Sequence, residues 1–223
     1  SYNLVTQVNG RGVYSFCMCP GGFIVPASTY ENECVVNGMS SSLRNSKFAN
    51  SGFVVEIRPE DLTSYAKYGV LAGLKFQEEY EHLSFVNGGG NAVAPAQRVK
   101  DFVDGIVSKD LPQTSYIPGV ISSPMHDWIP PFIRERLQEG LKEFDKKMKG
   151  YLTNQAIIVG VESRTSSPIR IPRNPDTLQH IEINGLYPCG EGAGYAGGIT
   201  SSAVDGELCA ERIFAKLNSL QSI

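Results

Sequence analysis

The densest group of residues that could do chemistry is a glycine-rich stretch near the end of the chain. Residues 190–198 read GEGAGYAGG and contain a G-x-G-x-x-G pattern at Gly192, Gly194 and Gly197. Glycines let backbone N–H groups approach an anionic or electron-rich group without interference from a Cβ atom, and a following helix N-terminus adds a partial positive charge. The pattern predicts a ligand-binding strand-to-helix turn; a turn without a ligand is the structural alternative.

The usual dinucleotide-binding interpretation of this stretch is incomplete. It requires a second parallel strand ending in an acidic residue about 20 residues further on, which binds the ribose. The sequence stops at Ile223, after the helix that we expect over 199–217, and we therefore expect no such strand.

Two cysteines near the start of the chain form a second candidate group. Cys17 and Cys19 precede Gly21 and Gly22. One interpretation is a metal site, but no second closely spaced ligand pair exists, and we predict no metal. Another is a redox-active thiol, with the glycines bringing backbone close to a ligand. The structural alternative is that both thiols are small buried groups on one face of a strand.

A polar turn supplies a third candidate group. Residues 162–168, which include Arg164, Thr165 and Ser166, directly follow an apolar run over 156–161. Polar residues at the carboxyl end of a buried strand are where α/β sheets place ligands. Arg164 can stabilise an anionic group such as a substrate carboxylate by a planar, charge-assisted contact. The alternative is a loop capped by its own hydroxyl groups.

Local patterns predict the elements that must position these residues. Short β-branched and aromatic runs predict antiparallel strands over 4–8, 13–17, 23–26, 34–36 and 53–57. Asn9-Gly10 predicts a hairpin. Composition and apolar periodicity predict helices over 69–86, within 95–106 and over 129–148, the last with Asp127 as its N-cap. The apolar run over 156–161 predicts a strand covered on both faces, and residues 178–183 alternate like a strand.

Composition limits the class of protein. The chain has 223 residues, of which 41% are hydrophobic and 19% charged, with a net charge of −3. These values exclude a disordered chain and argue against a nucleic-acid binder, which would need excess lysine and arginine. No run of 18 apolar residues predicts a membrane span. Five cysteines and no visible signal peptide favour a cytoplasmic protein with reduced thiols.

Longer stretches resemble a known family. GLYPCGEGAGYAGGITSSAVDGELCAERI, over 185–213, is similar to the C-terminal flavin motif of FAD oxidoreductases of the two-dinucleotide-binding type. Further stretches, at 10–28, 35–57, 88–102 and 159–171, resemble bacterial FAD-dependent, or NAD(FAD)-utilising, dehydrogenases. The resemblance implies an α+β or α/β chain. Residues 1–150 would be an inserted substrate (cap) domain with antiparallel strands and helices, and residues 151–223 the C-terminal strands and helix of the FAD domain.

The resemblance also implies roles for particular residues. The pyrimidine edge and ribityl chain of FAD would be held by Gly190, Glu191, Gly192, Ala193, Gly194, Tyr195, Gly197, Gly198 and Ile199. The flavin would also be approached by Thr165, Ser166, Gly21 and Gly22, and the candidate catalytic residues are Cys17, Cys19 and Arg164. FAD would carry hydride transfer for a small-molecule substrate, with NAD(P)H as a candidate partner.

The N-terminal βαβ unit with which such proteins bind ADP has no counterpart in this sequence. We therefore expect a middle and C-terminal portion of a longer flavoprotein, which binds no FAD by itself and self-associates through uncovered apolar surface. The alternative function is a non-catalytic ligand-binding or interaction domain with a glycine-rich anion-binding turn. A second alternative is a flavin-free cysteine enzyme, although no histidine lies near Cys17 or Cys19 in the sequence.

Overall fold

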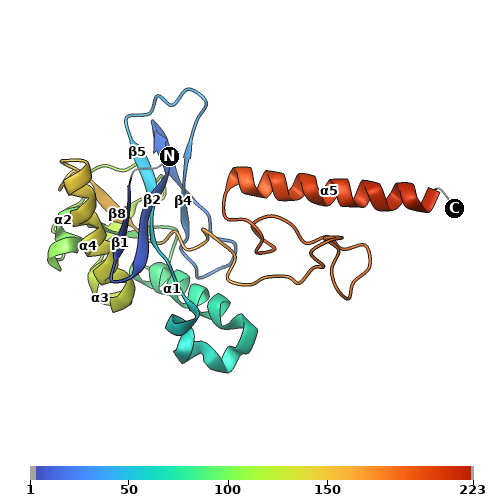
Figure 1. Ribbon diagram of the computed structural model, residues 1–223. Coiled ribbons are helices and arrows are strands. Elements are labelled where there is room, and N and C mark those ends of the chain that lie inside the picture. The colour runs from blue at the N-terminus through green and yellow to red at the C-terminus, as the bar shows by residue number, and fades with distance from the viewer. Residues whose placement is uncertain (1–3, 222–223) are drawn as a thin grey trace. The chain divides into compact units, whose positions relative to one another are not determined.

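The computed structural model describes residues 4–221, and the chain forms two compact units (Figure 1). The first unit comprises residues Ser1–Asp61 and Glu78–Ser163. The second comprises Leu62–Gln77 and Arg164–Ile223. The boundary near residue 150 that the sequence suggested for functional domains stays a prediction.

The first unit begins with an antiparallel sheet of order β1-β2-β5, formed by β1 (Val5–Val8), β2 (Arg11–Pro20) and β5 (Ala49–Val55). The predicted hairpin is confirmed: Val8 pairs with Arg11, and Asn9 and Gly10 both have positive φ, as a two-residue type I′ turn requires. Between Phe16 and Cys19 the pairing of β2 with β5 shifts register, which marks a β-bulge.

A two-stranded antiparallel sheet follows, formed by β3 (Gly22–Pro26) and β4 (Val36–Ser40). The strand predicted over 34–36 is wrong in its position, because β4 begins where that prediction ends. Cys34 and Val35 are used elsewhere: the Cys34 N–H donates to the Glu81 carbonyl, and the Val35 N–H donates to the Ser28 hydroxyl.

A third sheet, of order β7-β6-β8, combines β6 (Ala94–Arg98), β7 (Val120–Ser122) and β8 (Ile157–Val159). Strand β6 pairs in parallel with β7 and antiparallel with β8. No strand was predicted at these residues. The short helix predicted within 95–106 is confirmed as α2 (Val99–Asp104). Strand β8 was expected to be covered on both faces, but it is an edge strand with three half-buried residues.

The remaining helices are η1 (Pro59–Leu71), α1 (Ala72–Asn87), α3 (Met125–Trp128) and α4 (Pro131–Lys147). Helix α4 confirms the helix predicted over 129–148, but the predicted N-cap is wrong. Asp127 lies inside α3, and Pro130 stands at the N-cap of α4 without a side-chain cap. Pro131 fits the first turn because its missing N–H would have no acceptor there.

The main core of the first unit lies between the β1-β2-β5 sheet and helices α2 and α4. Val13, Phe102 and Phe144 are fully buried in it. Phe144 meets Phe53 and Tyr151 edge-on, each with ring centroids 5.7 Å apart. This layer supports β2, the strand that carries both Cys17 and Cys19.

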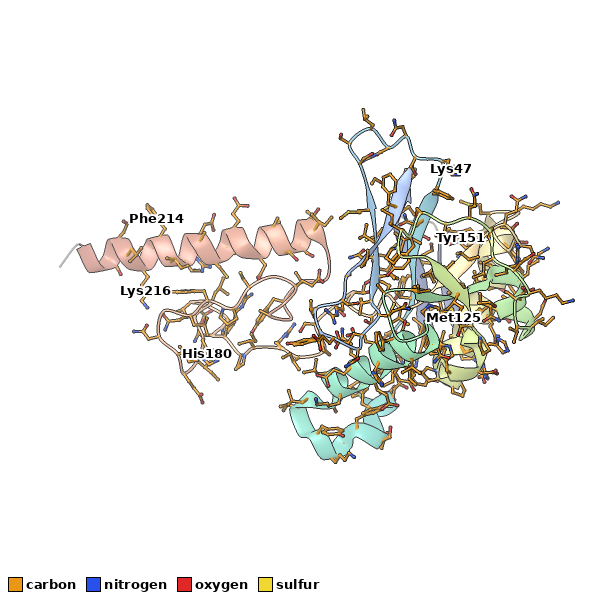
Figure 2. The ribbon with its side chains drawn as sticks, turned by 180° about the vertical axis from the view of Figure 1, so that it is seen from behind. Lys47, Met125, Tyr151, His180, Phe214 and Lys216 are labelled. Carbon is orange, nitrogen blue, oxygen red and sulfur yellow. The ribbon has the colours of Figure 1, made fainter. Side chains whose placement is uncertain are left out.

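The second unit contains a long looped segment over 164–198 followed by α5 (Ile199–Gln221). The strand predicted over 178–183 is wrong. Leu178 has a positive φ of 58°, and His180 donates its N–H to Leu186, so the segment turns back on itself. Lys216 of α5 donates to Gln179 and Asn184 on this loop, and Figure 2 shows Lys216 and His180 in this part of the chain. None of the helices within residues 4–221 is long and apolar enough to cross a membrane.

Candidate functional site

The glycine-rich turn precedes α5 and is folded tightly on itself. Gly190 and Gly194 have φ values of 69° and 80°, in the left-handed region that favours glycine. The Gly194 N–H donates to the Glu191 carbonyl at 2.9 Å, and the Tyr195 N–H donates to the Gly190 carbonyl at 3.0 Å. The turn predicted before a helix is therefore present, although a loop rather than a strand leads into it.

A neighbouring stretch of loop, residues 169–171, packs along this turn. The Ile171 N–H donates to the Ala193 carbonyl at 3.1 Å, and the Tyr195 hydroxyl donates to the Ile171 carbonyl at 2.8 Å. A Cβ atom on Gly194 would lie 2.5 Å from the Ile169 carbonyl oxygen. Gly194 is thus required by packing within the chain as well as by its φ.

An ion pair holds the turn from the other side. Arg173 donates to both carboxylate oxygens of Asp205, at 2.6 and 3.0 Å, and to the Pro188 carbonyl at 2.7 Å. One Asp205 oxygen also accepts the Gly190 N–H at 2.8 Å. The Arg173 guanidinium lies 3.6 Å from the centre of the Tyr195 ring, a cation–π contact. These contacts join the start of the turn, its tyrosine and the second turn of α5 into one network.

The charges in this network stabilise one another. The hydrogen bond from Arg173, opposed by burial and supported by the Gly190 N–H, holds the pKa of Asp205 below its ordinary value. The Asp205 carboxylate in turn raises the pKa of Arg173. Both groups are charged at neutral pH, and Arg170 adds a second guanidinium 4.8 Å from the Tyr195 ring centre.

The other glycines of the turn are not required by packing or by backbone conformation within the chain. A Cβ atom on Gly192 or Gly197 would meet nothing within 4 Å, and one on Gly198 would make only ordinary contact with Ser201, at 3.6 Å. None of the three has a positive φ. Because these three glycines carry no side chain, open space remains beside the backbone at the start of α5.

This open space fits a group with negative or electron-rich atoms. The first N–H groups of a helix have no acceptor within the helix, and the 23 residues of α5 give it a full dipole. Next to them, the Ser202 hydroxyl is buried without a hydrogen-bond partner. The donors and the missing Cβ atoms are what a flavin edge or a phosphate would use.

The polar turn proposed above lies in the second unit as well. Thr165 is half-buried and Ser166 exposed. Ser167 donates its hydroxyl to the Ile169 carbonyl at 2.8 Å and accepts the Ile169 N–H, as in a hydroxyl-capped loop. Ligand contact by Arg164, Thr165 and Ser166 stays a prediction.

The two candidate thiols, Cys17 and Cys19, lie in the first unit. Cys17 occupies the β-bulge with a φ of 47° and is exposed, while Cys19 is half-buried and donates its thiol to the Cys17 carbonyl at 3.3 Å. The pair is therefore not buried as small apolar groups would be. A Cβ atom on Gly21 would lie 2.0 Å from the Arg44 carbonyl oxygen, and one on Gly22 would lie 2.7 Å from Cys19. Internal packing is thus a sufficient reason for both glycines, and their contact with a ligand stays a prediction.

Sequence reasoning missed Arg170, Arg173 and Asp205. Asp205 falls inside the stretch that carries the family resemblance, but no spacing rule joins it to an arginine 32 residues earlier. Among residues 4–221, no three or more histidine, cysteine or acidic side chains are grouped to hold a metal ion.

Comparison with known proteins identifies the family. Residues 1–165 match the model of the family described as FAD-dependent protein, C-terminal domain-like. The chain is also 48% identical, over 210 residues, to an uncharacterized protein of Clostridium beijerinckii. That alignment covers 93% of this chain but only 39% of the relative. The chain belongs to the FAD-dependent protein C-terminal domain-like family, and the resemblance seen in the sequence is confirmed.

Proposed function

We propose that the chain is the substrate-binding and flavin-closing part of an FAD-dependent oxidoreductase, in which FAD takes a hydride from a small-molecule substrate. The observation that carries this proposal is the start of α5. Packing within the chain does not require glycine at Gly192, Gly197 or Gly198. These residues lie next to the first N–H groups of α5, which have no acceptor within the helix. In a family of FAD-dependent proteins, a flavin is the group that would use this space.

The proposed flavin contacts are made by backbone more than by side chains. The N–H groups of Gly197, Gly198 and Ile199 would donate to the pyrimidine edge or the ribityl oxygens, and the Ser202 hydroxyl would gain a partner. When bound, FAD supplies two-electron chemistry that amino-acid side chains lack. The open space at these glycines supports this assignment because a Cβ atom would narrow it.

The role of the chain's own charges is to favour negative charge at the turn. Because Arg173 is neutralised by Asp205, the positive potential at the turn comes from the helix dipole and from the exposed Arg170, and the exposed Glu191 carboxylate opposes it. The ion pair acts as a positioning device that fixes Gly190 and Tyr195. We propose that Arg164, Thr165 and Ser166 extend this surface toward the substrate.

The proposal extends to the rest of the longer protein. Residues 1–150 would serve as the cap domain and residues 151–223 as part of the FAD domain, with the ADP portion of FAD bound by an N-terminal segment. Helix α5 exposes Ile199, Val204, Leu208, Phe214 and Leu217, which such a segment would cover. Cys17 and Cys19, with Gly21 and Gly22, are proposed to contact flavin or substrate, and NAD(P)H is a candidate electron donor. In the chain by itself, the uncovered face of α5 would favour self-association.

The test replaces one glycine of the open set in the full-length protein. Gly197→Val places a side chain where the flavin is proposed to lie, and we expect the purified protein to lose its flavin while keeping its fold. The matched control is Gly206→Ala, because Gly206 also meets nothing within 4 Å but lies further along α5. Flavin content is measured from the visible absorption spectrum and the protein concentration. A Gly197→Val protein with the same flavin content as the wild type and the control would refute the assignment.

A further inference from the structure

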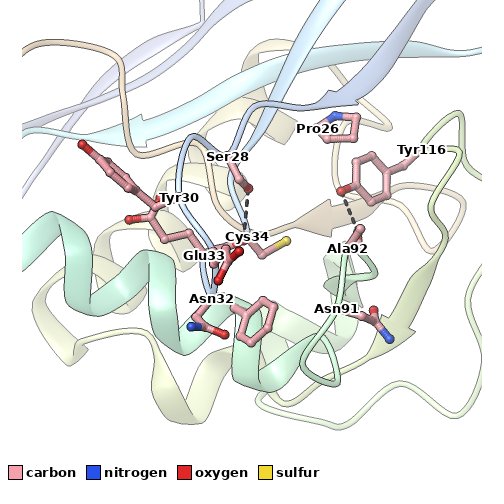
Figure 3. Close-up of a pocket in the computed structure, with 11 residues that line it drawn as sticks. Pro26, Ser28, Tyr30, Asn32, Glu33, Cys34, Asn91, Ala92 and Tyr116 are labelled. Atoms are coloured by element: carbon pink, nitrogen blue, oxygen red, sulfur yellow. Dashed lines mark hydrogen bonds between the residues drawn. The ribbon is translucent and has the colours of Figure 1, made fainter.

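A cavity in the first unit has no role in the proposed flavin site. Its volume is about 410 Å³, and its lining includes Glu31, Glu33, Cys34, Phe85, Ala92 and Tyr116. Figure 3 shows Tyr30, Asn32 and Glu33 on one side and Pro26, Tyr116 and Asn91 on the other, with the Cys34 sulfur between them. This volume is within the usual range for small-molecule pockets, about 300–1,000 Å³.

Two aromatic rings in the wall of the cavity, Phe85 and Tyr116, make contacts within the chain that fix their orientation. Tyr116 is buried and donates its hydroxyl to the Ala92 carbonyl at 2.8 Å, which fixes the orientation of its ring. Phe85 stacks on His82 with ring centroids 6.3 Å apart, and the His82 ring nitrogen bonds to the Asn32 carbonyl at 2.9 Å. Both rings are therefore held in place before any ligand arrives.

The floor of the cavity is a neutral thiol. Cys34 is 2% exposed and lies in a small apolar core with Val36, Ala94 and Tyr116. Burial raises the pKa of Cys34, so the group stays uncharged at neutral pH. The fully buried Ser84 hydroxyl lies beside the sulfur and partly offsets this rise in the pKa of Cys34, but burial is the larger effect. The base of the cavity thus suits an apolar body.

The charges around the cavity have a single sign. Among its lining residues, all within the described part of the chain, the charged side chains are Glu31 and Glu33, and none is lysine or arginine. Aromatic faces and carboxylates both attract a cation, and both disfavour an anion. Asn32 and Asn91 add amide groups that can accept hydrogen bonds from an ammonium group.

We propose that this cavity binds a small organic cation: an amine carried on a flat apolar body. The body would lie between Phe85 and Tyr116 above the Cys34 thiol, and the ammonium group would face Glu31 and Glu33. The proposal uses residues of the first unit alone and does not depend on where a flavin binds. The cavity proposal can therefore fail while the flavin assignment holds, and the flavin assignment can fail while the cavity proposal holds.

Three probes that share a ring and differ in charge test the proposal: benzylamine, benzyl alcohol and benzoate. Each is titrated into the ¹⁵N-labelled chain, whose amide spectrum also reports whether the fold is intact. We expect benzylamine to shift the amides of the lining residues saturably, with a dissociation constant of about 1 mM or lower for so small a compound. Benzoate is expected to bind at least about tenfold more weakly because both carboxylates repel it. Equal binding of the amine and the carboxylate, or shifts outside the lining residues, would overturn the proposal.

Two sets of variants separate the cavity from general effects. Ala92→Trp fills the exposed mouth without changing the core and should weaken benzylamine binding at least about tenfold, whereas Ala49→Trp, on exposed β5 surface, should not. Glu31→Gln with Glu33→Gln should abolish the preference for benzylamine over benzyl alcohol. Its control, Glu79→Gln with Asp104→Asn, makes the same change in net charge on exposed surface outside the cavity. If each control weakened binding as much as its partner, the cavity would not be the site.

Discussion

The ion pair between Arg173 and Asp205 can be tested by the isosteric change Asp205→Asn. In the wild type the carboxylate accepts two hydrogen bonds from Arg173 and one from the Gly190 N–H. The amide keeps the size of the side chain but removes its charge and one acceptor. Arg173 then loses its only carboxylate partner, and neutral acceptors and the Tyr195 ring are what remain for its charge. We expect the start of the glycine-rich turn to open more often.

The magnitude follows from how the pair is enclosed. The Arg173 and Asp205 side chains are 9% and 13% exposed, but they lie in a thin layer near the surface rather than in a deep core. A hydrogen bond between charged groups contributes about 1.5–3 kcal/mol, and a deeply buried pair would exceed this. We therefore expect the local opening free energy at Gly190 to fall by about 2 kcal/mol, which is roughly a 30-fold change in the opening equilibrium.

The effect should depend on pH in a defined direction. The pKa of Asp205 is lower in the folded chain than in the unfolded chain, chiefly because of the hydrogen bond from Arg173. Its stabilisation is therefore complete above the ordinary carboxyl pKa of about 3.9 and is lost as the pH falls through the folded-state pKa. Wild type and Asp205→Asn should differ most near neutral pH and should converge in acid.

Amide hydrogen exchange of the segment 188–198 measures this opening directly. At neutral pH, exchange at Gly190 should be roughly 30-fold faster in Asp205→Asn, as converted above. The control is Asp110→Asn, which also removes a carboxylate paired with an arginine, Arg98, but one that is 80% exposed. That variant should leave exchange over 188–198 unchanged. Equal protection of Gly190 in wild type and Asp205→Asn, or a difference that persists in acid, would refute the reasoning.

Three further predictions concern packing and thiol exposure. Gly194→Ala should destabilise the second unit by about 1–3 kcal/mol, because residue 194 has a positive φ and a carbonyl oxygen close to the added Cβ atom. Gly192→Ala should change the unfolding free energy by less than about 0.5 kcal/mol. Urea unfolding followed by circular dichroism measures both variants. Phe144→Ala should lower the unfolding free energy by about 3–5 kcal/mol in the same assay. A loss below about 1 kcal/mol would contradict the burial of Phe144 in the main core. Peptide-resolved labelling should find the exposed Cys17 modified much faster than the buried Cys34, whose pKa is raised, and similar rates would contradict their placement.

Local patterns predicted the elements that are decided locally. Asn9-Gly10 specified its hairpin because a two-residue type I′ turn needs two residues that tolerate positive φ. Helix α4 was predictable because its apolar residues recur at the helical period over four turns and pack on one sheet. Its N-cap was not, since Asp127 is the better capping residue by type, but the chain turns again at Pro130.

Long-range pairing explains the elements that were misplaced. No strand was predicted over residues 94–98, yet they form β6 because β7 and β8, from distant parts of the chain, supply partners on both of its edges. Residues 178–183 alternate like a strand, but they have no neighbouring strand and fold into turns instead. Alternation fits a strand only where a partner exists, and the partner is not visible in the local sequence.

The glycine-rich turn separates what a motif can predict from what only geometry can. The G-x-G-x-x-G pattern treats Gly192, Gly194 and Gly197 alike, but only Gly194 is required by the chain's own φ and packing. A glycine that nothing in its own chain requires is the more informative one for the proposed site, because a group approaching from outside would account for it. This is why Gly197, rather than Gly194, is the position at which a substitution can distinguish loss of a ligand from loss of the fold.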